Sequence, residues 1–176
     1  MKSNFLQTIS ATVIGGLISA FVSVVVTYYI PKLQQEEEGK KWLQIFAVEI
    51  EGYHGSDIIC ERIQTVNKKI KEFNNTNLLE NRLITPDSEL NLPSIYKSNL
   101  DKVGLLKSED AENIMNFHTY FNNSLIIFSE SSIYNKVGFN KKTLNALLEQ
   151  LTNAEKYRKK VLDSANIKYE SKCEID

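Results

Sequence analysis

An uncharged segment near the N-terminus constrains this chain more than any other feature. No charged side chain stands between Lys2 and Lys32, and the strongly apolar part runs from Ile9 to Ile30. A helix of that length spans about 33 Å, which is enough to cross the hydrocarbon core of a bilayer, roughly 30 Å thick. We therefore expect a transmembrane helix that ends at Pro31, because proline interrupts helical hydrogen bonding.

A cleaved signal peptide is the alternative interpretation of this segment. Its apolar core would be about 7 to 15 residues long and would precede a cleavage site made of small residues. Here the apolar core is longer, and the sequence "VVVTYYIPKLQQEEE" contains no A-x-A pattern. We expect residues 1–32 to be a retained membrane anchor.

The distribution of lysines predicts the orientation of this anchor. Lys2 and the α-amine flank it on the N-terminal side, whereas Lys32, Lys40 and Lys41 follow it. Positive charge concentrates on the cytoplasmic side of membrane helices, and acidic residues such as 36–38 count little in that rule. The sequence thus predicts a single-pass protein of the inner (plasma) membrane with its C-terminal part in the cytoplasm.

Small residues recur at every fourth position along the apolar segment. Residues four apart lie on one helix face, and close backbone approach is what drives helix association in lipid. The larger side chains Ile14, Leu17, Phe21 and Val25 fall on the opposite face. We expect the anchor to self-associate, giving a homo-oligomer, although small residues are also common in membrane helices that do not associate. The predicted association residues are Ala11, Gly15, Gly16, Ser19, Ser23 and Thr27.

Few glycines and prolines interrupt the rest of the chain, since the whole sequence has only 7 glycines and 3 prolines. Long uninterrupted segments favour helices over a β-sandwich. Apolar spacing predicts helices over 34–73, 94–103, 108–130 and 141–165, with a weak point at Gly52 and Gly55, and a frayed tail from residue 166. The predicted fold is all-α: one transmembrane helix, then an antiparallel bundle of about four helices over 33–170 and a flexible tail over 171–176.

The order of features resembles that of a loose group of small bacterial and phage membrane proteins. The motifs are "FAVEIEGYH" in the first long helix, "PSIY" in a short one, a "GLL" break, an aromatic-rich helix and a leucine-rich last helix. The resemblance covers most of the chain. It implies a single-pass topology and a helical cytoplasmic domain, and it implies no activity.

Candidate catalytic and metal-binding residues are few. His54 shares a helix face with Glu51, Asp57 and Glu61, but a solvated charged face explains this pattern better than a metal site. His118 falls on an apolar face, so we expect it in the core. Cys60 and Cys173 are too few and too far apart for a disulfide scaffold or a zinc site, so we expect free thiols, with pairing as the alternative.

No nucleophile elbow or glycine-rich phosphate loop is present in the sequence, and the formal net charge is −1. We therefore expect no enzymatic activity, no cofactor or metal, and no nucleic-acid partner.

Two charged residues interrupt the apolar stripes. Glu49 lies at the centre of the stripe of the first long soluble helix, and Arg158 at the centre of the stripe of the last one. Burying one charge alone costs several kcal/mol, which is comparable to the whole free energy of unfolding of a domain. We expect the two side chains to form a buried ion pair. Alternatively, Glu49 binds a basic group of a ligand or of a partner protein.

The functional prediction is a membrane-anchored, non-enzymatic interaction protein whose partners are the lipid bilayer, further copies of the chain and an unidentified cytoplasmic protein. The alternative is a membrane effector, of the toxin or phage-defence type, that perturbs the bilayer on oligomerisation. Only the effector would collapse the membrane potential when expressed, so that measurement distinguishes the two.

Overall fold

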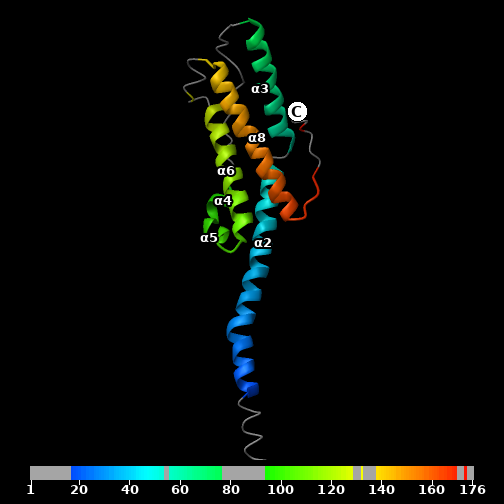
Figure 1. Cartoon of the computed structure of the whole chain (residues 1–176), viewed down its shortest axis with the longest axis vertical. Helices are drawn as coiled ribbons and strands as arrows, with labels where there is room; N and C mark the ends of the chain where they lie inside the picture. Colours follow the sequence, from blue (N-terminus) through cyan, green and yellow to red (C-terminus); the bar gives the residue numbers. More distant parts are fainter. Residues whose placement is uncertain are drawn as a thin grey trace, which may run out of the picture.

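The computed structural model of the chain describes residues 17–53, 56–76, 94–128, 132, 138–169 and 173. Within these ranges the regular structure is helical and no strand occurs, which confirms the predicted all-α class. A long helix extends away from a compact group of helices, with its free part near the N-terminus (Figure 1).

The long helix runs without interruption from Leu17 to the end of α2 (Ile30–Tyr53). Its middle is a π-helical turn, η1 (Val25–Tyr29), in which the Ile30 N–H donates to the Val25 carbonyl. The predicted end at Pro31 is therefore wrong. A proline ring normally clashes with the carbonyl four residues earlier, which here belongs to Thr27. Thr27 lies inside the π-helical turn, whose hydrogen bonding differs from that of an α-helix.

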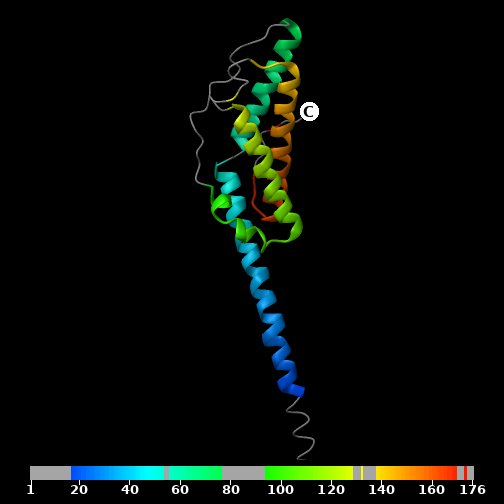
Figure 2. The ribbon, with the colours of Figure 1, turned by 90° about the vertical axis from the view of Figure 1, so that its left-hand side faces the viewer.

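The soluble helix predicted over residues 34–73 is two helices, α2 and α3 (Ser56–Thr76). They follow one another along one side of the molecule (Figures 1 and 2). The break between them falls in the region where the sequence predicted a weak point. Residues 54 and 55 lie outside the described ranges. In place of the predicted bundle of about four antiparallel helices, α2 and α3 lie end to end, and two further long helices pack beside them.

Those two long helices are α6 (Ser108–Phe128) and α8 (Lys141–Ser164). The Asn140 side chain accepts a hydrogen bond from the Thr143 N–H at 2.9 Å, so Asn140 caps α8 as predicted. α8 runs antiparallel to α3 and α6 and packs against both of them and against α2 (Figure 2). The apolar core lies along α8, and its fully buried members include Phe46, Ile50, Ile59, Val66, Ile114, Phe117, Leu147, Leu151 and Leu162.

Two single-turn helices, α4 (Ile95–Ser98) and α5 (Leu100–Val103), replace the one short helix predicted before Gly104. The Ser94 side chain caps α4 by accepting from the Lys97 N–H at 3.2 Å. Both short helices contact α2, which also packs against α8.

The segment after α8 folds back on the helices, and the expectation of a frayed tail from residue 166 is wrong for its described part. Asn166 adopts a left-handed conformation, with φ of 55°. Its N–H donates to the Asp163 carbonyl at 3.0 Å, and the Ile167 N–H donates to the Leu162 carbonyl at 2.9 Å. This Schellman motif reverses the chain and brings Ile167 and Tyr169 against the core.

Gly39 is the residue of α2 that lies against the backbone of the segment between α5 and α6. An ideal Cβ placed on Gly39 would stand 2.4 Å from the Leu105 carbonyl oxygen, which is backbone and cannot rotate away. Glycine at this position lets the segment between α5 and α6 lie directly on α2. In contrast, a Cβ on Gly52 would meet nothing within 4 Å.

We predict that Gly39→Ala destabilises the protein by about 1–3 kcal/mol, because the added methyl group overpacks the contact with Leu105. Gly52→Ala is the matched control in the same helix, and it should stabilise by about 0.5–1 kcal/mol through the higher helix propensity of alanine. Urea unfolding of the full-length protein in detergent, followed by circular dichroism, measures both. Equal effects of the two substitutions would contradict the close approach.

Candidate functional site

The most polar buried group in the described structure surrounds Arg158. This side chain is 0 % exposed, on the face of α8 that packs toward α2. Its Nε donates to Glu155 Oε2 at 2.7 Å and its Nη2 to Glu155 Oε1 at 3.0 Å, while its Nη1 donates to Glu51 on α2. Glu155 is also fully buried, and Glu51 is half-buried. The guanidinium therefore joins the last helix to the upper end of α2.

The partners of Arg158 keep it charged despite burial. Desolvation by burial acts to lower the pKa of Arg158, but the hydrogen bonds and negative charges of Glu155 and Glu51 outweigh it, and the pKa is raised. The Lys159 ammonium lies 3.7 Å from Glu155 Oε1 and adds a second positive charge. Two carboxylates and two cations thus balance one another in this group.

Tyr169, from the segment that follows α8, covers the guanidinium. Its ring centroid lies 5.0 Å from Arg158 Cζ, within the range of a cation–π contact. Burial raises the pKa of Tyr169, and the nearby negative charge of Asp163 raises it further. Both effects favour the neutral form of the phenol that lies against the guanidinium.

Glu49 has a different role from Arg158. It is 4 % exposed, and its two carboxylate oxygens accept from the Ile95 N–H at 2.7 Å and the Tyr96 N–H at 3.0 Å. The first turn of a helix leaves these backbone donors without intrahelical partners. Glu49 on α2 thus satisfies two donors of α4, and Ser94 satisfies the next one.

Aromatic rings complete the contact between α4 and its neighbours. Tyr96 stacks on His118 of α6, with ring centroids 3.9 Å apart and planes 8° from parallel. The Phe46 ring meets Tyr96 edge to face at 6.1 Å. Burial raises the pKa of Tyr96. His118 is 5 % exposed, which confirms its predicted place in the core.

The predicted ion pair between Glu49 and Arg158 is replaced by two separate interactions. Both side chains are buried as expected, but within the described residues Glu49 binds the α4 backbone and Arg158 binds Glu51 and Glu155. Residues two apart on a helix point about 200° away from each other. The sequence therefore predicted the correct helix for the partner of Arg158 and the wrong residue on it.

We predict that Arg158→Ala destabilises the protein by about 3–5 kcal/mol, because Glu155 is left buried without its guanidinium. Glu49→Ala should cost about 1–3 kcal/mol through two unpaired backbone donors. Because these residues share no partner, their effects should add in the double variant to within about 0.5 kcal/mol. Glu51→Ala combined with Arg158→Ala should instead cost less than the sum of the single changes.

Urea denaturation of the three single and two double variants of the full-length chain measures these differences. A coupling energy between Glu49 and Arg158 as large as that between Glu51 and Arg158 would restore the ion pair predicted from sequence and exclude the present arrangement.

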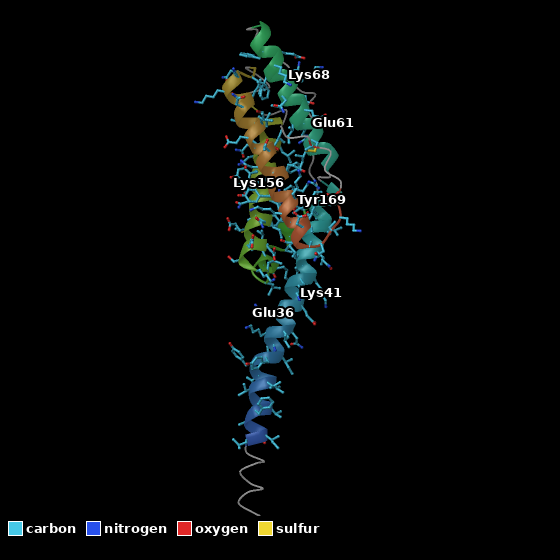
Figure 3. All side chains as sticks on the ribbon, turned by 45° about the vertical axis from the view of Figure 1, so that its right-hand side comes forward. Glu36, Lys41, Glu61, Lys68, Lys156 and Tyr169 are labelled. Atoms are coloured by element: carbon cyan, nitrogen blue, oxygen red, sulfur yellow. A yellow bond between two sulfur atoms is a disulfide. The ribbon has the colours of Figure 1, made fainter. Side chains whose placement is uncertain are left out.

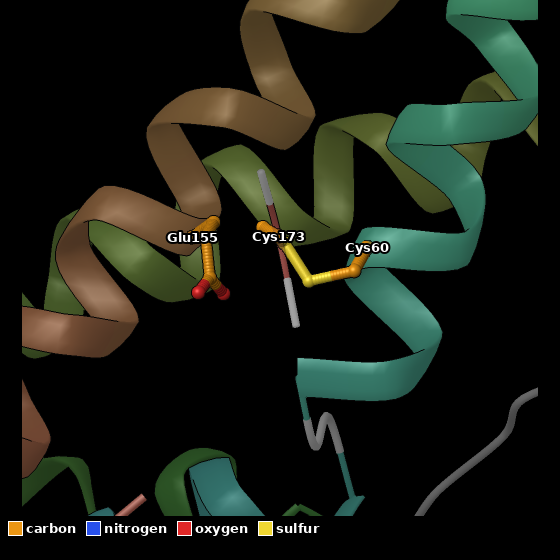
Figure 4. Close-up of side chains that lie close together, drawn as sticks. All are labelled: Cys60, Glu155 and Cys173. Atoms are coloured by element: carbon orange, nitrogen blue, oxygen red, sulfur yellow. A yellow bond between two sulfur atoms is a disulfide. The ribbon is translucent and has the colours of Figure 1, made fainter. Parts of the chain in front are cut away.

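The expectation of two free thiols is wrong. Cys60 on α3 and Cys173 near the C-terminus form a disulfide, with Cα atoms 5.0 Å apart and a sequence separation of 113. The sulfur and carboxylate atoms of Cys60, Cys173 and Glu155 all lie within 4.8 Å of one another, between α3 and α8 (Figure 4). The reversal of the chain after α8 brings Cys173 there, and no local sequence pattern indicates it.

The remaining charges lie mostly on the surface. Figure 3 shows Glu61 and Lys68 on α3 and Lys156 on α8 pointing outward from the helical domain, as expected for solvated faces. At the end of the domain nearest η1 is a cleft of ≈ 600 Å³, whose lining includes Lys32, Lys40, Lys107, Glu36 and Asp110. Its charges have both signs, and its lining contains no histidine or cysteine.

The predicted association face is described only in part. Ala11, Gly15 and Gly16 lie outside the described residues, as does His54. Ser19, Ser23 and Thr27 are exposed on the part of the long helix that stands apart from the other helices, and Thr27 lies in η1. Their association therefore stays a prediction.

Comparison with known proteins finds no matching family model, no matching curated protein and no matching solved structure. The resemblance to small bacterial and phage membrane proteins thus stays a prediction from the sequence.

Proposed function

We propose that this chain is a single-pass membrane protein without catalytic activity, which self-associates through its membrane helix and presents its helical domain to a protein partner. The observation that carries the proposal is the exposed apolar surface of residues 17–30. One helix in the described part is long and apolar enough to cross a membrane. Its large side chains stand outside the domain, with Leu17 at 67 % and Phe21 at 71 % exposure.

Exposed apolar side chains on this scale need a covering, because each would otherwise order water unfavourably. A bilayer supplies the covering for the large residues on one face. The small residues on the other face suit close contact with a second helix, where the hydroxyls of Ser19 and Ser23 can bond across the interface. Self-association in the membrane follows from this division of the helix.

The continuous helix supports a further part of the proposal. Because α2 continues the membrane helix into the domain, association of the anchors would fix the spacing and direction of the attached domains. Dimerised domains could then bind a partner at two points, which strengthens binding without any new contact. No catalytic arrangement among the described side chains argues for a different role.

We predict that changing Gly15 and Ser19 to Ile abolishes self-association, because branched side chains prevent the helices from approaching closely. The same change at Leu17 and Phe21 is the matched control on the lipid-facing side and should have little effect. Membrane two-hybrid signal or crosslinking of the full-length chain measures association. Equal loss from both pairs would contradict an interface built on the small residues.

We place the domain on the cytoplasmic side of the inner (plasma) membrane, on the strength of Lys32, Lys40 and Lys41 against Lys2. The Cys60–Cys173 disulfide favours the opposite side, because disulfides persist in oxidising compartments and are rare in the cytoplasm. On the cytoplasmic side, Cys60 and Cys173 would therefore be held as thiols for most of the time.

Fusions after Asp176 test the orientation. A fluorescent protein should be bright there and alkaline phosphatase inactive, because phosphatase requires an oxidising compartment to form its disulfides. An active phosphatase would place the domain outside the cytoplasm and would make the Cys60–Cys173 bond a permanent structural crosslink.

A further inference from the structure

We propose that Cys60, Cys173 and Glu155 form a binding site for a thiophilic divalent cation, of which Zn²⁺ is the biological candidate, whenever the two cysteines are reduced. The disulfide is then the oxidised, metal-free form of the same centre. The proposal rests on these three side chains and the charged groups around them, and it holds whether or not the proposed membrane function is correct.

The first argument is geometric. The two sulfurs and a carboxylate oxygen already lie within 4.8 Å of one another. Ligand atoms on a tetrahedral zinc stand about 3.5–3.8 Å apart, given Zn–S bonds of about 2.3 Å and Zn–O bonds of about 2.1 Å. Once the sulfur–sulfur bond is broken, side-chain movements on the order of 1 Å complete three ligands. Water can take the fourth position.

The second argument concerns the chemical type of the ligands. Thiolates select soft or borderline metals such as Zn²⁺, whereas Mg²⁺ and Ca²⁺ require oxygen ligands. Cys60 is 3 % exposed and Glu155 is fully buried, so two of the three ligands are held on long helices, α3 and α8, that pack against each other. The third ligand arrives with the segment that follows α8.

The third argument is the support around Glu155. Arg158 donates one hydrogen bond to each carboxylate oxygen of Glu155, at 2.7 Å to Oε2 and 3.0 Å to Oε1. A carboxylate oxygen has two lone pairs, so Oε2 has a second lone pair that can bind a metal. Carboxylates that bind metals are commonly oriented by such outer hydrogen bonds. Arg158 therefore fixes Glu155 in place and does not occupy it fully.

The fourth argument is the balance of charge. Arg158 and Lys159 offset Glu155 and Glu51, so the oxidised centre is close to neutral. Two thiolates would add two negative charges to a buried site, and a divalent cation restores neutrality. Without the metal the cysteines would stay protonated, because an uncompensated buried charge is costly.

The chemical steps balance with a phosphine as reductant. The phosphine takes the oxygen of one water molecule and becomes a phosphine oxide. The sulfur–sulfur bond breaks, and two electrons from the phosphine together with the two protons of that water convert the disulfide to two thiols. Metal binding then releases one proton from each thiol to solvent and forms two metal–sulfur bonds.

The test uses the full-length protein in detergent, reduced with a water-soluble phosphine that is then removed, with Cd²⁺ and Zn²⁺ as probes. We expect one metal ion per chain after desalting, a cadmium–thiolate absorption band, and protection of both cysteines from maleimide. The oxidised protein and the Cys173→Ser variant should each retain less than a tenth of that metal. Reduced wild type that binds no more metal than Cys173→Ser would overturn the proposal.

Glu155→Gln tests the carboxylate ligand and should weaken Cd²⁺ binding at least tenfold. Glu149→Gln, on the exposed side of the same helix, is the matched control and should bind as wild type does. Should Glu155→Gln lose helical signal in circular dichroism, Glu155→Asp replaces it, since it keeps the charge beside Arg158 but withdraws the oxygen by one methylene. Unchanged affinity in the folded variant would reject Glu155 as a ligand.

Discussion

The helical domain depends on the buried charge of Arg158. A guanidinium with 0 % exposure is tolerable only with its hydrogen bonds made and its charge offset, and Glu155 and Glu51 provide both. These contacts fix three things at once. They set how α8 meets α2, they hold Glu155 in one orientation, and they give Tyr169 a cation to cover. Tyr169, which follows α8, is thereby held against the helices.

A second polar contact anchors the opposite face of α2. Glu49 supplies the hydrogen bonds that the first turn of α4 lacks, and Tyr96 then packs between Phe46 and His118. Glu49 and Glu51 are close in sequence and face opposite neighbours, so α2 is fastened on two sides. These two contacts hold the C-terminal part of α2 in the domain, although the N-terminal part of the long helix stands free of it.

The two ends of the chain give the molecule its functional character. Near the N-terminus, the long helix carries apolar side chains that the domain does not cover, which supports the proposed membrane anchor. Near the C-terminus, two cysteines and a carboxylate meet in a centre whose chemistry depends on redox conditions. The proposed metal-binding form requires reduced cysteines, so the redox state of the compartment in which the domain lies would decide which form of that centre is present.

The sequence by itself determined the all-α class, the long apolar helix and the approximate bounds of α6 and α8, because hydrophobic spacing and capping residues such as Asn140 act locally. It also identified Glu49, Arg158 and His118 as buried, since each interrupts or joins an apolar stripe. The tertiary structure alone decided their partners. Glu49 meets α4, Arg158 meets Glu51 rather than Glu49, and Cys60 meets Cys173 across 113 positions. These pairings depend on the orientation of each helix about its own axis and on the point after Leu162 at which the chain reverses. The hydrophobic period of a single helix specifies neither.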